Sequence, residues 1–243
     1  MLTLPSIPPL FTAVQEQARA RQAQLTKPAG SLGQLEDISI QLAAITGQLR
    51  PSLANKAVIV MAGDHGVAHE GVSAYPSEVT PQMVLNFLHG GAAINVLARQ
   101  AGARVVVVDM GVASDLPPRP GLQTRKIARG TQNMAALPAM TRPQAEAAIA
   151  TGLEVVNAEI ANGLDLVATG DMGIGNTTPS SAIVAAITGR PVAEITGRGT
   201  GVDDAGLWQD RHQPPRDRQL LRTGDLEDGP AAASRTDGPN GQL

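Results

Sequence analysis

The chain has 243 residues and a mass of 25.0 kDa, with 42% hydrophobic and 17% charged residues. This composition supplies a sizeable apolar core, which excludes intrinsic disorder for most of the chain and suits one large domain or two small ones. A net charge of −3 and the lack of cysteine exclude an electrostatic nucleic-acid partner and disulfide or thiolate chemistry. No apolar run is long enough to span a bilayer, so we expect a cytoplasmic protein without a membrane partner.

Helices are predicted over residues 10–26 and 31–49, separated by a loop in which Ser31 is suited to cap the second helix. Apolar side chains in the second helix recur at spacings of three and four, which places them on one helical face. They are Leu32, Leu35, Ile38, Leu42, Ile45 and Leu49.

Three continuous apolar runs of strand length follow, at residues 57–61, 104–108 and 164–168. Runs without polar alternation are typical of strands buried on both faces, as in a parallel sheet. Helical segments alternate with these runs, so the sequence predicts a Rossmann-like α/β fold with a doubly wound, mostly parallel sheet.

Thr80-Pro81 has the pattern of an N-cap followed by proline at the first helical position. The helix it predicts is interrupted or ended by Gly90-Gly91, and a further helix runs to about Arg99. Thr141 repeats the capping pattern for a helix that ends at Ala161. The expected buried stripe of that last helix is Ala145, Ile149, Leu153, Val156 and Ile160.

The composition changes abruptly near Trp208. Residues 208–243 contain no Val, Ile or Met, four Leu, eleven charged residues, and eight Gly or Pro. Such a segment is not expected to form a packed element, and we interpret it as an aberrant, disordered tail.

Polar, Gly-containing segments follow all three strands, where open α/β sheets bind their ligands. Each segment taken alone could equally be an ordinary turn or part of a binding site. Three such segments in one chain favour a shared binding site. The segments are Gly63-Asp64-His65-Gly66, Asp109-Met110-Gly111 and residues 170–179.

The third segment is the most informative, because it is rich in glycine and leads into a helix capped by Thr177 or Thr178. A glycine loop before a helix N-terminus presents backbone N–H groups and a positive dipole end to an anion, and phosphate is the expected guest. A second glycine-rich loop, Gly197 to Gly201, holds Arg198, which is either a phosphate clamp or part of a flexible connector.

His65 lies close in sequence to Asp64, His69 and Glu70. A histidine that is ordered by Asp64 or bonded to a ligand is a better interpretation than a metal site. Tyr75 either contacts a flat ligand or is partly buried structure.

These segments resemble, in order, those of nicotinate-nucleotide–dimethylbenzimidazole phosphoribosyltransferases over about residues 5–207. The matching segments are Leu25 to Gly33, Gly63 to Val67, Ser73 to Met83 with Asn86 to Asn95, Gly173 to Thr178, and Gly197 to Gly201.

The resemblance implies transfer of 5-phosphoribose from nicotinate mononucleotide to 5,6-dimethylbenzimidazole, with inversion at the anomeric carbon. The products are α-ribazole 5′-phosphate and nicotinate, for the lower ligand of cobalamin. The resemblance also implies a homodimer without metal or organic cofactor. It implies a Rossmann-like core over 51–207 and a small helical domain to which residues 1–50 contribute.

The resemblance also assigns roles to particular residues. Asp171 is the expected catalytic carboxylate, and Tyr75, Ser77 and Gln82 are expected to contact the aromatic base. The expected phosphate and nucleotide ligands are Gly173, Gly175, Asn176, Thr177, Thr178, Arg198, Gly199, Thr200 and Gly201.

Two departures from the family pattern bear on activity. Asp171 stands where the family usually has glutamate, which shortens its reach by one methylene group. The family also continues for roughly a hundred residues beyond Gly201, and that part carries a glutamate thought to act as general base. No residue here matches it, and Glu227 lacks the right context.

Back-translation of Trp208 to His212 with a one-base shift allows Gly-Lys-Ile-Ala-Thr, which resembles the family's continuation. We therefore interpret the tail as a reading-frame error that has replaced or garbled the C-terminal part. The chain as written is expected to be inactive, and the alternative is a truncated relative that only binds nucleotide or base.

Overall fold

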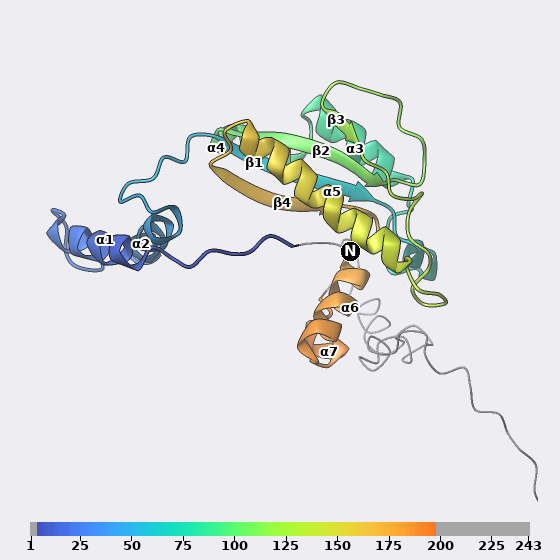
Figure 1. Ribbon diagram of the computed structural model, residues 1–243. Coiled ribbons are helices and arrows are strands. Elements are labelled where there is room, and N and C mark those ends of the chain that lie inside the picture. The colour runs from blue at the N-terminus through green and yellow to red at the C-terminus, as the bar shows by residue number, and fades with distance from the viewer. Residues whose placement is uncertain (1–3, 198–243) are drawn as a thin grey trace, which may run out of the picture.

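The computed structural model describes residues 4–197, which fold into short helices around a parallel sheet (Figure 1). The elements in chain order are α1 (Thr12–Gln24), α2 (Gln34–Thr46), β1 (Lys56–Gly63), the 3₁₀ helix η1 (Gly66–Glu70), α3 (Val79–His89), α4 (Ala93–Ala101), β2 (Ala103–Gly111), β3 (Leu122–Thr124), α5 (Arg142–Ala161), β4 (Leu166–Met172), α6 (Thr177–Thr188) and α7 (Val192–Ile195).

The four strands lie in the order β3-β2-β1-β4, and every neighbouring pair is parallel. Val58 of β1 lies opposite both Val105 of β2 and Ala168 of β4, so β1 is the central strand of the three longer ones. The chain steps outward from β1 to β2 and β3, then returns through α5 to the other side of β1. The predicted doubly wound α/β fold is confirmed, and its direction reverses between β1 and β4.

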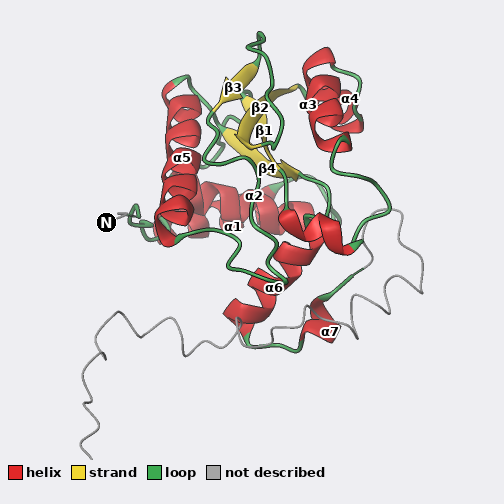
Figure 2. Ribbon diagram, turned by 90° about the vertical axis from the view of Figure 1, so that its right-hand side faces the viewer, coloured by secondary structure: helices red, strands yellow, loops and turns green. Residues whose placement is uncertain are grey.

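Helices cover both faces of the sheet, with α5 on one side and α3 and α4 on the other (Figure 2). Val60 and Ala62 of β1 pack in one core cluster with Val84 and Phe87 of α3. Alternate residues of the same strand, including Ile59, pack in a second cluster with Val155 of α5. Because side chains alternate across a strand, β1 is buried on both faces, as its apolar run predicted.

The third predicted strand departs from this pattern. β4 spans 166–172 rather than 164–168, and Leu166 and Val167 are 42% and 38% exposed. Burial on both faces was therefore wrong for this strand within residues 4–197, because β1 is its single strand neighbour there.

Helices α1 and α2 pack against each other around Ala18, Ile40 and Ala43, and the pair lies apart from the sheet (Figure 1). The leucine and isoleucine stripe of α2 is not buried as a whole, since Leu35 is 64% and Ile45 is 53% exposed. The assignment of this pair to a small domain stays a prediction.

Several helix starts differ from their sequence signals. Ser31 does not cap α2, which begins at Gln34 after turns within residues 28–33. The Glu36 carboxylate there accepts a hydrogen bond from Leu32 N–H and pairs with Lys27, which lowers the pKa of Glu36. α3 begins at Val79, so Thr80 lies within its first turn and is not the cap.

The remaining two starts give one confirmation and one correction. Thr141 caps α5, with its hydroxyl accepting from the backbone of Gln144 and its N–H donating to the Gln144 side chain. The residue before α6 is Asn176, so the predicted cap at Thr177 or Thr178 was displaced by one or two positions.

The buried face of α5 was also misplaced. Val155 and Glu159 are buried, whereas Ile149 and Ile160 are about half exposed. Glu159 turns inward because Arg104 of β2 donates to its carboxylate at 2.7 Å, a pairing that apolar periodicity does not register. No helix within residues 4–197 has the length and apolar character that crossing a membrane requires.

Candidate functional site

The carboxyl ends of β1 and β4 meet at the point where the sheet reverses direction, which is where doubly wound folds bind ligands. Their backbones are in close contact. A Cβ atom at Gly173 would overlap the carbonyl oxygen of Gly63 and would lie 2.9 Å from the His65 ring atoms Cδ2 and Nε2. Glycine at 173 therefore permits the two strand ends to touch.

The loop after β4 is fixed from two directions. Thr80 in α3 accepts a hydrogen bond through Oγ1 from the backbone N–H of Ile174 at 3.1 Å. The side-chain amide of Asn176 donates to Oδ2 of Asp171 at 2.5 Å, and Gly175 turns the chain with φ of 82°. The loop thus delivers the chain to Thr177 at the positive dipole end of α6, where the Thr178 N–H is bonded to the Gly175 carbonyl oxygen and Pro179 has no N–H.

A cavity of about 490 Å³ opens beside this loop, and we call it the loop cavity. It brings the predicted residues Asp171, Tyr75 and Asn176 together with Gly173, Gly175 and Thr177. Its lining residues are Val72, Ser73, Tyr75, Val79, Met83, Asp171, Met172, Gly173, Ile174, Gly175, Asn176 and Thr177.

Other predicted site residues are placed differently. Ser77 and Gln82 do not line the loop cavity, and Thr178 lies one residue beyond it. Ser73, which begins the matching segment from Ser73 to Met83, takes part in its wall. Arg198, Gly199, Thr200 and Gly201 lie outside the described residues, as does the predicted tail at 208–243.

His65 is partly buried at the end of β1. Burial lowers its pKa below the ordinary 6.5, and the carboxylates of Asp171 and Asp64 oppose that shift only in part. The imidazole is therefore neutral at pH 7. Asp64 is also buried, with Oδ2 accepting from the backbone N–H of Ala113 at 2.7 Å.

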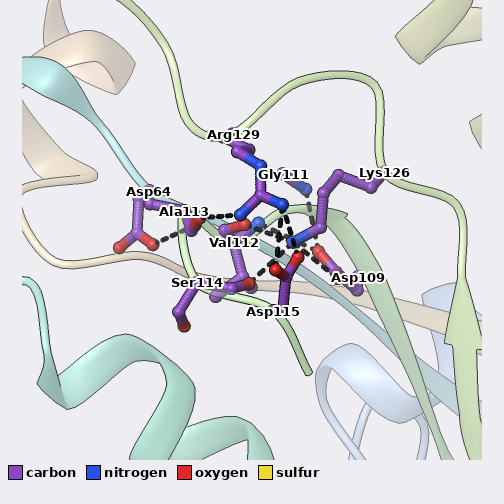
Figure 3. Close-up of polar contacts among 9 residues, drawn as sticks. All are labelled: Asp64, Asp109, Gly111, Val112, Ala113, Ser114, Asp115, Lys126 and Arg129. Carbon is purple, nitrogen blue, oxygen red and sulfur yellow. Dashed lines mark hydrogen bonds and ion pairs between the residues drawn. The ribbon is translucent and has the colours of Figure 1, made fainter. Parts of the chain in front are cut away.

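The loop after β2 is held by a cluster of polar contacts (Figure 3). Asp109 is 1% exposed, and its Oδ1 accepts from the N–H groups of Gly111 and Val112 at 3.1 and 2.9 Å. Lys126 lies 3.4 Å from Oδ2 of Asp109 and donates to the carbonyl oxygens of Val112 and Ser114. The Asp109 carboxylate therefore shapes the loop rather than facing a ligand.

A second cavity, of about 410 Å³, lies between the strand ends, residues 127–132 and α5, and we call it the sheet cavity. It shares Asp171 and Met172 with the loop cavity. Its lining residues are Met61, Ala62, Gly63, Asp64, His65, Met110, Gly111, Ile127, Ala128, Arg129, Gly130, Thr131, Gln132, Ala139, Met140, Gln144, Ala148, Asp171 and Met172.

Within the described residues, the histidine and carboxylate side chains near His65 do not form a metal site. Within residues 4–197 no three His, Asp or Glu side chains converge on one point as a metal site requires. The carboxylate of Glu70 instead accepts from the Asn133 amide at 2.5 Å, which ties η1 to the segment before α5.

The fold and the glycine-rich loop at its reversal point belong to a recognised class of enzyme. The profile of a phosphoribosyltransferase family matches residues 7–212, five residues past the end that the motifs indicated. The chain belongs to this family, whose nicotinate-nucleotide–dimethylbenzimidazole phosphoribosyltransferases were the members it was predicted to resemble.

Relatives of that name are closely similar to the chain. The protein from Chloroflexus aurantiacus is 58% identical over 239 residues, covering 93% of this chain and 68% of the relative. The protein from Roseiflexus sp. is 64% identical over 205 residues, covering 84% of this chain and 58% of the relative. The chain thus spans 58% to 68% of these proteins' length.

Solved structures agree with the sequence comparison. CobT from Thermus thermophilus superimposes with a TM-score of 0.78 at 54% identity, over 82% of this chain and 60% of that one. A second structure from that organism, titled with the full enzyme name, gives a TM-score of 0.75 at 51% identity.

Proposed function

We propose that this chain binds nicotinate mononucleotide and 5,6-dimethylbenzimidazole and carries the machinery that transfers 5-phosphoribose between them. The observation that carries the proposal is the position of Asp171, which borders the loop cavity beside the glycine-rich start of α6. The enzyme names of relatives 58% and 64% identical support the same assignment.

The phosphate is proposed to rest on residues 173–178. The positive dipole end of α6 favours an anion at this loop, and the N–H of Thr177 at the first helical position is the proposed backbone donor. Asn176 and Thr177 add side chains at the same edge of the cavity. Arg198, Gly199, Thr200 and Gly201 stay proposed as further nucleotide ligands.

Asp171 is proposed to stabilise the transition state. When the bond between C1′ and the pyridine nitrogen breaks, its electron pair stays on nitrogen and positive charge develops on the ribose. A fixed carboxylate near C1′ lowers the energy of that charge. The contact from Asn176 to Oδ2 orients the carboxylate and leaves Oδ1 for the ribose.

The incoming benzimidazole is proposed to lie against Tyr75 in the loop cavity, where Val79 and Met83 add an apolar wall. Ser73 supplies a hydroxyl group at that wall, and Ser77 and Gln82 stay proposed as hydrogen-bonding groups near it. As the base bonds to C1′, its N–H proton passes to a general base. We propose no residue of this chain for the role that the family resemblance gives to a glutamate.

A second candidate follows from that lack, namely a chain that binds nucleotide and base but turns them over very slowly. We also propose a homodimer in the cytoplasm, without metal or organic cofactor, as the family resemblance implies.

The test is to incubate the purified 243-residue chain with both substrates and to measure α-ribazole 5′-phosphate by chromatography, with binding by calorimetry in parallel. Binding with product supports the transferase, and binding without product supports the second candidate. Asp171→Asn should lower binding or turnover at least tenfold, whereas Asp37→Asn on the distant α2 should change neither. Absence of binding by the unmodified chain would overturn both candidates.

A further inference from the structure

The two walls of the loop cavity come from segments that are far apart in the sequence. One wall belongs to the first turns of α3 and the segment before it, and it includes Tyr75, Val79 and Met83. The other wall is the loop after β4, at residues 172–177. In the proposed function the acceptor base lies against the first wall and the nucleotide phosphate rests on the second.

Thr80 joins these two walls from behind the cavity. It lies in the first turn of α3 next to Val79, it is fully buried, and it does not line the cavity itself. Its Oγ1 accepts the backbone N–H of Ile174 at 3.1 Å. In the part of the chain that the structure describes, no other hydrogen bond connects α3 with residues 173–176.

The loop depends on this hydrogen bond for its arrangement. Ile174 stands between Gly173 and Gly175, and glycine allows the backbone more conformations than any other residue does. The N–H of Ile174 is buried, so it needs an acceptor, and the Thr80 hydroxyl supplies one. A shift in the first turn of α3 would therefore release the middle of the loop.

We propose that Thr80 is a positioning residue that couples the binding of the two substrates. This inference rests on the proposed function. A base packed against Val79 and Met83 fixes the first turn of α3, and the Thr80 hydroxyl then holds the loop in the arrangement that receives the phosphate. One neutral hydrogen bond supports a coupling of about two- to tenfold.

The coupling acts in both directions, because a binding equilibrium that one ligand shifts must respond equally to the other. The phosphate-bearing substrate therefore strengthens binding of the base by the same factor. This arrangement favours the complex that holds both substrates, which is the complex in which the displacement takes place.

Calorimetry on the full 243-residue chain measures the coupling. Ribose 5-phosphate is the probe for the phosphate wall, because it carries the phosphoribose without a leaving base and so cannot take part in the transfer. It is titrated with and without saturating dimethylbenzimidazole, and the reverse titration follows. Each ligand should bind at least threefold more tightly when the other is present.

Three variants assign the coupling to the hydroxyl group. Thr80→Val should bind dimethylbenzimidazole alone as the unmodified chain does, but that base should no longer strengthen binding of ribose 5-phosphate. Thr80→Ser keeps the acceptor and should keep the coupling. Val155→Ala, in the core on the opposite face of the sheet, should lower stability and leave the coupling intact, which separates coupling from stability.

A measurement on the unmodified chain covers the case in which Thr80→Val does not fold. Dimethylbenzimidazole alone should slow amide hydrogen exchange at Ile174 at least threefold relative to exchange at Val155, because a fixed α3 turn keeps the Ile174 N–H bonded. Exchange at Ile174 that the base leaves unchanged would contradict the inference.

The outcomes separate this inference from the function on which it rests. If the unmodified chain binds both ligands without coupling, or if Thr80→Val keeps the coupling, the inference is wrong and the proposed function stands. If the unmodified chain binds neither nicotinate mononucleotide nor dimethylbenzimidazole, the proposed function is overturned and this inference with it. Coupling that is lost in Thr80→Val and kept in Thr80→Ser supports the inference.

Discussion

The Oγ1 atom of Thr80 accepts a hydrogen bond from the backbone N–H of Ile174 at 3.1 Å, across 94 residues of sequence. Thr80 is fully buried in the first turn of α3, and Ile174 lies in the loop that delivers Gly175 and Asn176 to the candidate site. One side chain therefore links the helix beside the proposed base to the loop proposed to hold the phosphate.

Thr80→Val should destabilise the protein by about 1–3 kcal/mol, because valine keeps the volume but leaves the buried N–H of Ile174 without an acceptor. The free energy of unfolding from urea titration measures this. Thr80→Ser, which retains the hydroxyl oxygen, is the control and should recover most of the loss. Equal stability of the Val variant and the unmodified protein would show that the contact contributes little.

Gly173→Ala should cost about 1–3 kcal/mol, because its methyl group would collide with backbone at Gly63 and with the His65 ring. The variant should also weaken nucleotide binding, since the strand ends must separate. Gly152→Ala in α5 is the matched control, because nothing lies within 4 Å of its Cβ position. That change should raise stability by about 0.5–1 kcal/mol, the helical preference of alanine over glycine.

Lys126→Met should cost about 1.5–3 kcal/mol, because it removes the cation beside the buried carboxylate of Asp109 and two hydrogen bonds to the β2 loop. Arg142→Met, which breaks an exposed pair with Glu146, should change stability by less than about 0.5 kcal/mol. Thermal and urea denaturation of both variants provide the comparison. Similar effects of the two changes would contradict the role given to Lys126.

The protein should lose stability as the pH falls below about 6.5, in part through His65. Its pKa is held below 6.5 by burial in the folded state, so the unfolded chain binds the proton more readily in that range. Protonation therefore favours unfolding. His65→Gln should reduce the slope of unfolding free energy against pH between 7 and 5.5. A slope unaltered by His65→Gln would overturn this interpretation.

The sequence predicted the sheet well because apolar runs report burial directly. Residues 57–61 and 104–108 lie inside β1 and β2, and parallel pairing followed from their lack of polar alternation. β3, with three residues, is too short for such a signal. β4 was shifted because its carboxyl half, from Thr169 to Met172, is polar and glycine-containing, like the loops that follow strands elsewhere.

Helix starts were less predictable, because the residue that caps a helix depends on the contacts that its side chain makes elsewhere in the folded protein. Thr80 has the local signature of a cap, but its hydroxyl bonds to Ile174, which no local pattern reveals. Thr141 did cap α5, because its hydroxyl group and the Gln144 side chain form a local reciprocal pair.

The candidate site was predictable where a glycine-rich loop meets a helix start, as at residues 173–177. The second cavity was not, because its wall draws on Met61, Arg129 and Ala148, which lie in three separate segments. They come together because residues 130 and 131 bond to the ends of β1 and β2 and α5 packs on the sheet. These residues lie too far apart in the sequence to form a recognisable motif.

The central place of β1 has a consequence for biosynthesis. Val58 pairs first with Val105, and its other partner, Ala168, emerges from the ribosome only after α5 has been made. A nascent chain therefore carries an apolar strand with one edge unpaired for the whole of that interval. Such an edge is a template for aggregation, so this protein should depend on chaperones most during the translation of α5, and least once β4 is complete.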